Sequence, residues 1–88
     1  MLSNAEEPVA WVMLMYELGD AHEHLGVLIH RMNAEGSIDE PEYAAQLAHV
    51  FAHLNRAWHG RDDTDLDHIS SDLHSERSQY PVDLTPVG

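Results

Sequence analysis

The apolar residues in the first third of the chain recur at the spacing of an α-helix. Between Pro8 and Asn33 they lie alternately three and four residues apart, which is an a/d heptad pattern. This first seam consists of Trp11, Leu14, Leu18, Ala21, Leu25, Leu28 and Met32. Pro8 suits a first helical turn, and Gly36 marks a loop after the pattern ends. We therefore predict a helix over residues 8–33.

A second helix is predicted over residues 38–59. Ser37 and Glu40 have the spacing of a capping box at its start, and Gly60 ends the pattern. Its apolar seam consists of Tyr43, Leu47, Val50, Leu54 and Ala57, and Ala44, Ala48, Phe51 and Trp58 widen the apolar face. Because the loop between the two predicted helices is short, we expect them to form an antiparallel hairpin.

A shorter third helix is predicted over residues 65–77, with Leu66, Ile69 and Leu73 as its apolar stripe. Pro81 and Pro86 exclude a helix in the tail, residues 80–88, which should be extended. The predicted fold class is all-α, with one helical domain over residues 1–79. A chain of 88 residues buries a small core, so a partner would help to stabilise it.

A second apolar stripe runs along the first predicted helix beside the first. This second seam consists of Val12, Met15, Gly19, His22, Gly26 and Ile29. Each glycine inside a helix makes the free energy of helix formation about 1 kcal/mol less favourable than alanine does. We expect the glycines to allow close contact with the third helix, or with a second copy in a homodimeric four-helix bundle. The alternatives are that the glycines are merely tolerated, or that the helix kinks there.

Polar side chains flank the first seam on both helices. On the first helix they are Glu17, Asp20, His24 and Arg31, and on the second they are Gln46, His49, His53 and Arg56. One antiparallel register places Glu17 near Arg56, Asp20 near His53 and His24 near His49. The stripe then acts as an interhelical ladder of ion pairs and hydrogen bonds.

The same stripe has an alternative interpretation as a metal site. His49 and His53 are one helical turn apart, and Asp20 and His24 face them in the proposed register. Imidazoles with a carboxylate suit a divalent metal such as zinc, nickel or iron. Otherwise the sequence predicts no cofactor.

The chain is strongly acidic, with 16 acidic residues, four arginines, no lysine and a formal net charge of -12. Such a charge disfavours direct binding to nucleic acids or anionic membranes and favours a basic partner protein. We assign Asp62, Asp63, Asp65 and Asp67 to an acidic partner surface. These acids also resemble the start of a calcium loop, but His68 and His74 stand where that loop needs glycine and glutamate.

The start of the chain lacks the basic residues of a signal peptide, and the longest apolar run, Val9 to Tyr16, is too short to span a bilayer. The absence of cysteine excludes disulfides and thiolate ligands, and it fits a reducing compartment. We therefore expect a cytoplasmic protein.

The segment Glu17 to Asp20, "ELGD", resembles the Glu-x-x-Asp half of MazG-like nucleoside triphosphate pyrophosphohydrolases. The resemblance implies an all-α, magnesium-binding enzyme. The family's preceding Glu-Glu-x-x-Glu motif is represented only by "EEPV", Glu6 to Val9, which is too close and lacks the third glutamate. No set of basic residues is present to hold a triphosphate, and no nucleophile motif is found.

The leading functional prediction is a non-catalytic interaction protein that binds a basic protein surface. It would act as an inhibitor, an antitoxin-like or immunity-like regulator, or an adaptor. The alternative is a different kind of function, that of a histidine/carboxylate metal-binding helical bundle. The remote alternative is a remnant of a MazG-like enzyme.

Overall fold

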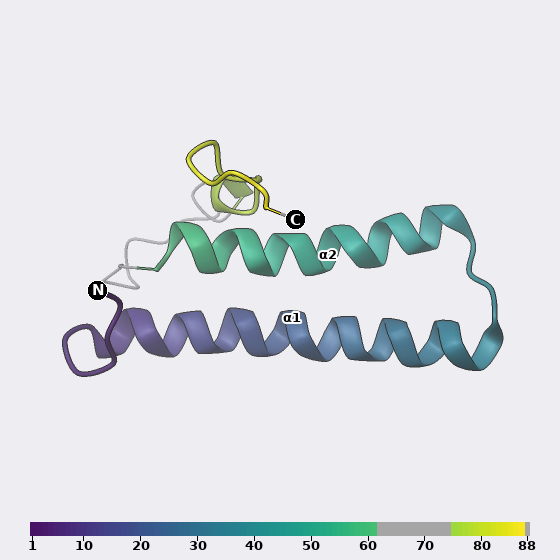
Figure 1. Cartoon of the computed structure of the whole chain (residues 1–88), viewed down its shortest axis with the longest axis horizontal. Coiled ribbons are helices and arrows are strands. Elements are labelled where there is room, and N and C mark those ends of the chain that lie inside the picture. Colours follow the sequence, from purple (N-terminus) through teal and green to yellow (C-terminus); the bar gives the residue numbers. More distant parts are fainter. Residues whose placement is uncertain (62–74, 88) are drawn as a thin grey trace.

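The computed structural model describes residues 1–61 and 75–87 of the chain. Two long helices, α1 (Pro8–Glu35) and α2 (Glu40–His59), pack side by side in antiparallel orientation (Figure 1). Residues 75–77 are helical and belong to a short third helix. The prediction of an all-α helical hairpin is therefore confirmed. Residues 62–74, which contain most of the predicted third helix and its acidic cluster, lie outside the described residues.

The helix boundaries differ slightly from those predicted. Helix α1 continues two residues beyond Asn33, because Gly36 ends it in a left-handed conformation (φ 70°) and donates its N–H to the Met32 carbonyl at 2.8 Å. The predicted capping box at Ser37 is wrong. Residues 37–39 form the interhelical loop, and Asp39 is the residue before α2, without a side-chain capping hydrogen bond. Gly60 follows the end of α2, as predicted.

The hydrophobic core of the hairpin is small. Its buried apolar residues are Ala10, Ala21, Leu28, Val50 and Ala57. Leu18 and Leu25, which the heptad pattern placed at the centre of the first seam, are 44% and 39% exposed. Helix α1 is rotated about its axis relative to the predicted packing, so that the polar edge of the first seam faces α2, and Leu18 and Leu25 are turned toward solvent. The packing between the two helices is therefore partly polar.

The second seam is open to solvent. Val12, Met15 and Ile29 are between 47% and 54% exposed, and His22 is exposed rather than packed. Among the described residues, and apart from the adjoining residues and nearby backbone of α1 itself, no atom lies within 4 Å of where a Cβ on Gly19 or Gly26 would stand. The hairpin itself thus gives these glycines no close neighbour.

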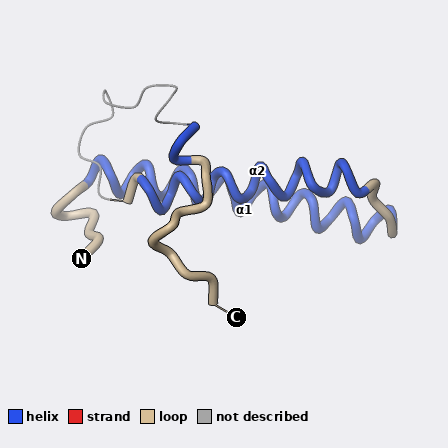
Figure 2. Tube along the Cα trace, turned by 90° about the horizontal axis from the view of Figure 1, so that it is seen from above, coloured by secondary structure: helices blue, strands red, loops and turns tan. Residues whose placement is uncertain are grey.

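The C-terminal segment lies against the side of α2 that faces away from α1 (Figure 1). It crosses over the C-terminal half of that helix (Figure 2). Asn55 donates from Nδ2 to the Ser78 carbonyl at 2.9 Å, and Trp58 donates from Nε1 to Asp83 Oδ1 at 2.9 Å. Pro81 is buried. Residues 78–87 are not helical, in agreement with the positions of the prolines.

In the part of the chain that the structure describes, neither helix combines the length and the apolar character needed to cross a membrane.

Candidate functional site

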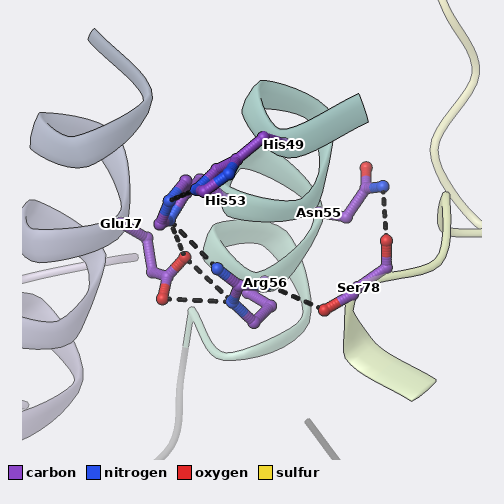
Figure 3. A network of polar contacts seen from close by, with 6 residues as sticks. All are labelled: Glu17, His49, His53, Asn55, Arg56 and Ser78. Carbon is purple, nitrogen blue, oxygen red and sulfur yellow. Dashed lines mark hydrogen bonds and ion pairs between the residues drawn. The ribbon is translucent and has the colours of Figure 1, made fainter. Parts of the chain in front are cut away.

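A polar network joins the N-terminal half of α1 to the C-terminal half of α2 (Figure 3). Glu17 of α1 accepts from Arg56 Nε through both carboxylate oxygens, at 3.2 and 3.1 Å. Its Oε2 also lies 3.0 Å from Nδ1 of His53. These side chains are well shielded, with relative exposures of 18% for Glu17, 15% for Arg56 and 10% for His53. The predicted contact between Glu17 and Arg56 is confirmed.

The predicted pairing of Asp20 with His53 is wrong, because His53 is bound by Glu17 instead. Glu17 lies one helical turn before the buried Ala21, so it faces α2 directly, whereas Asp20 is exposed. A carboxylate facing the interface can meet both Arg56 and His53 at once. Glu17, the first residue of the "ELGD" segment, thus takes part in pairing α1 with α2.

Three imidazoles gather beside this network. His24 of α1 meets His49 of α2, with ring centroids 4.2 Å apart, as the predicted register requires. His49 Nε2 and His53 Nε2 lie 3.0 Å apart. One ring nitrogen from each of the three histidines lies within 4.8 Å of the others. His24 and His49 are exposed, and His53 is buried. The Asp20 carboxylate, which the sequence placed in the same site, does not join this group.

The environment of His49 favours its neutral form. Its pKa lies below the usual value near 6.5, first because neighbouring groups displace part of the water around the ring, and then because positive charge at His24, His53 or Arg56 would oppose a proton on His49. Asp20 acts in the opposite direction. A neutral imidazole keeps a lone pair available to accept a proton, a hydrogen bond or a metal ion.

The proton of His53 has two possible positions with different partners. If Nδ1 carries it, this nitrogen donates to Glu17 and leaves the Nε2 lone pair directed at His49. If Nε2 carries it, Nδ1 accepts from the Arg56 Nη2 group at 3.0 Å. One ring nitrogen thus lies between a carboxylate and a guanidinium, and the choice of tautomer decides which of them it binds.

Sequence reasoning missed an ion pair at the loop end of the hairpin. Arg31 of α1 binds Glu42 of α2 bidentately, with Nη2 donating to Oε2 at 2.8 Å. The hydrogen bond from Arg31 lowers the pKa of Glu42. The signal was available, because the register that pairs Glu17 with Arg56 also sets Arg31 opposite Glu42.

The remaining predicted site residues fall into two groups. The second seam is exposed along α1, on a face separate from the histidine cluster. The acidic partner surface, Asp62, Asp63, Asp65 and Asp67, lies outside the described residues.

The fold and site together define a helical hairpin whose two helices are joined by a Glu–His–Arg network flanked by two more histidines. No protein-family model matches the chain, and neither the curated proteins nor the solved structures gave a match.

Proposed function

We propose that this protein is a non-catalytic, acidic α-helical interaction protein that dimerises through its second seam and binds a basic protein surface. The observation that carries the proposal is the exposure of an apolar stripe along α1 in a hairpin with a very small core. Soluble helices normally bury such a stripe, so a partner surface accounts for it.

A second copy of the chain is the occupant that we propose for the second seam. Of the five buried apolar residues within the two described helices, three are alanines, so one hairpin buries little apolar surface on its own. Gly19 and Gly26 lie seven residues apart on the exposed stripe, which permits close approach of another helix. Two hairpins joined there make a four-helix bundle with a larger core.

The charge of the hairpin supports a basic protein as the further partner. Arg31 and Arg56 are paired with Glu42 and Glu17, and Arg61 stacks over Trp58 with its guanidinium carbon 3.9 Å from the ring centroid. These cations are therefore neutralised or covered within the chain. Exposed carboxylates such as Glu23 and Glu40 remain at the surface, adding to a net charge of -12. That charge attracts basic surfaces and accelerates their association.

The dimer is tested by the double substitution Gly19→Ala with Gly26→Ala. In an isolated hairpin the added methyl groups meet open space, so each should stabilise α1 by up to about 1 kcal/mol. In a dimer packed on the glycines they should instead weaken self-association at least tenfold. Sedimentation equilibrium measures this, with Val27→Ala as a matched control, because Val27 is exposed outside the second seam. A wild-type monomer at micromolar concentration would refute the proposed dimer.

The basic partner is tested by the salt dependence of binding. A partner captured at low salt should be recognised as basic, and its affinity should fall strongly between about 50 and 500 mM salt, because exposed charges are screened. Binding that does not change over this range would refute charge-driven recognition, whichever protein is captured. The partner would then define the protein as an inhibitor, an antitoxin-like or immunity-like regulator, or an adaptor.

A further inference from the structure

The histidine cluster at the polar edge of the hairpin has the composition and spacing of a metal site. His24 comes from α1, and His49 and His53 come from α2, so the group spans both helices. Three neutral imidazoles are a ligand set that zinc and similar divalent transition metals prefer.

The distances are close to those that a bound ion requires. Zinc binds imidazole nitrogen at about 2.0–2.1 Å, and a tetrahedral angle between two such bonds places the nitrogens about 3.3 Å apart. The Nε2 atoms of His49 and His53 are 3.0 Å apart, so they need to separate by only a few tenths of an ångström. The ligand atom of His24 lies within 4.8 Å of the other two, and its exposed side chain has room to turn toward them.

A carboxylate already orients the most buried ligand. Glu17 Oε2 lies 3.0 Å from the Nδ1 atom of His53, on the far side of the ring from Nε2. Metal-binding histidines generally donate their second nitrogen to a carboxylate or carbonyl in this way, which fixes the tautomer and makes the ligating nitrogen more basic. Metal at Nε2 would therefore select the tautomer that donates to Glu17 over the one that accepts from Arg56.

We propose that His24, His49 and His53 bind one zinc-type divalent ion, with Glu17 as the positioning residue and the fourth ligand position open to water. The site goes beyond the proposed interaction function, since it uses a different edge of the hairpin. Asp20 stands one turn before His24 and contributes negative charge near the ion rather than a ligand. A bound ion links α1 to α2 in a chain that has no cysteine for a disulfide.

Untagged full-length protein, stripped with a chelator and titrated with zinc sulfate against a chromophoric zinc indicator, tests the site. We expect one equivalent to bind, and we expect the thermal midpoint to rise when zinc is added. His24→Gln and His49→Gln should each weaken binding at least about tenfold. Both side chains are exposed, so these variants should fold, and circular dichroism verifies this. His30→Gln is the matched control, an exposed histidine on α1 outside the cluster, and should bind as wild type.

The role of Glu17 is tested separately by Glu17→Gln. We expect a roughly 10- to 100-fold loss of zinc affinity. Nitrogen NMR of the His53 ring, recorded on metal-free protein, should then show that Nδ1 has lost its preference for the proton, a change that a purely structural role in holding Arg56 would not produce. Zinc at less than a tenth of an equivalent in the wild type would overturn the proposal, as would unchanged affinity in both His24→Gln and His49→Gln.

Discussion

The Glu17 carboxylate is predicted to be the most important single polar group for the stability of the hairpin. Substitution of Glu17 by alanine removes an acceptor shared by Arg56 and His53, both of them largely shielded from solvent. The substitution removes no apolar packing comparable to that of Leu28, so any loss of stability reports on the polar network.

The magnitude follows from the geometry. Hydrogen bonds to charged groups each contribute about 1.5–3 kcal/mol, and leaving one member of a buried pair alone costs about 3–5 kcal/mol. The network is not fully buried, and Arg56 keeps a hydrogen bond from Nη1 to Ser78 Oγ at 2.8 Å. We therefore expect Glu17→Ala to lower the free energy of unfolding by about 2–3 kcal/mol. For a domain of this size, that corresponds to a fall in the thermal midpoint of roughly 10–20 °C.

Urea unfolding followed by circular dichroism, in the presence of a chelator and at one protein concentration, measures the change. Glu42→Ala breaks the more exposed pair with Arg31 and should cost clearly less than Glu17→Ala. Glu23→Ala changes an exposed glutamate on the same helix and should lie within about 0.5 kcal/mol of wild type. If Glu17→Ala were no more destabilising than these two controls, the shielded network would not be what holds the helices together.

Two further predictions concern the loop and the response to acid. Gly36→Ala should lower the free energy of unfolding by about 1 kcal/mol or more, because Gly36 has a left-handed backbone conformation with φ 70°. Gly36→Asn should lower it by less, because asparagine tolerates that conformation better than alanine. Equal unfolding midpoints for wild type and Gly36→Ala would refute this. The pKa of His49 is lowered in the folded chain, so the unfolded chain binds more protons in acid, and stability should fall as the pH drops below about 6.5. Urea midpoints of metal-free protein across this range should show a shallower pH dependence for His49→Gln, and an unchanged dependence would exclude His49 as the cause.

Much of the fold follows from the spacing of apolar residues. Pro8 and the start of α1, the loop at Gly36 and the end of α2 before Gly60 all lie where the sequence predicts them. The antiparallel register was also predictable, because one offset pairs Glu17 with Arg56 and His24 with His49. A period of three and four residues thus determines which helices form and how they align along their length.

The rotation of each helix about its axis was not predictable in the same way. A heptad pattern treats Leu18 and Leu25 as equivalent to Ala21 and Leu28, yet only the last two are buried. With apolar stripes on two adjacent faces of α1, hydrophobicity alone leaves the rotation open. The hydrogen bond that Arg56 Nε shares between the two carboxylate oxygens of Glu17 needs short distances, and it accompanies a rotation that turns the polar edge of α1 toward α2. The same rotation replaces the expected Asp20 contact with His53 by that of Glu17.

The rotation also separates two surfaces that the sequence could not distinguish. Successive residues of an α-helix are about 100° apart, so Gly26 lies about 200° around α1 from His24. The histidine cluster and the second seam therefore lie on nearly opposite faces of α1. An ion held by His24 and the two histidines of α2 would stabilise only the paired hairpin, the conformation that presents the second seam to a partner. Metal binding should then favour self-association although the ion does not contact the second seam. A ligand that binds only the folded hairpin raises the population of chains that are able to dimerise.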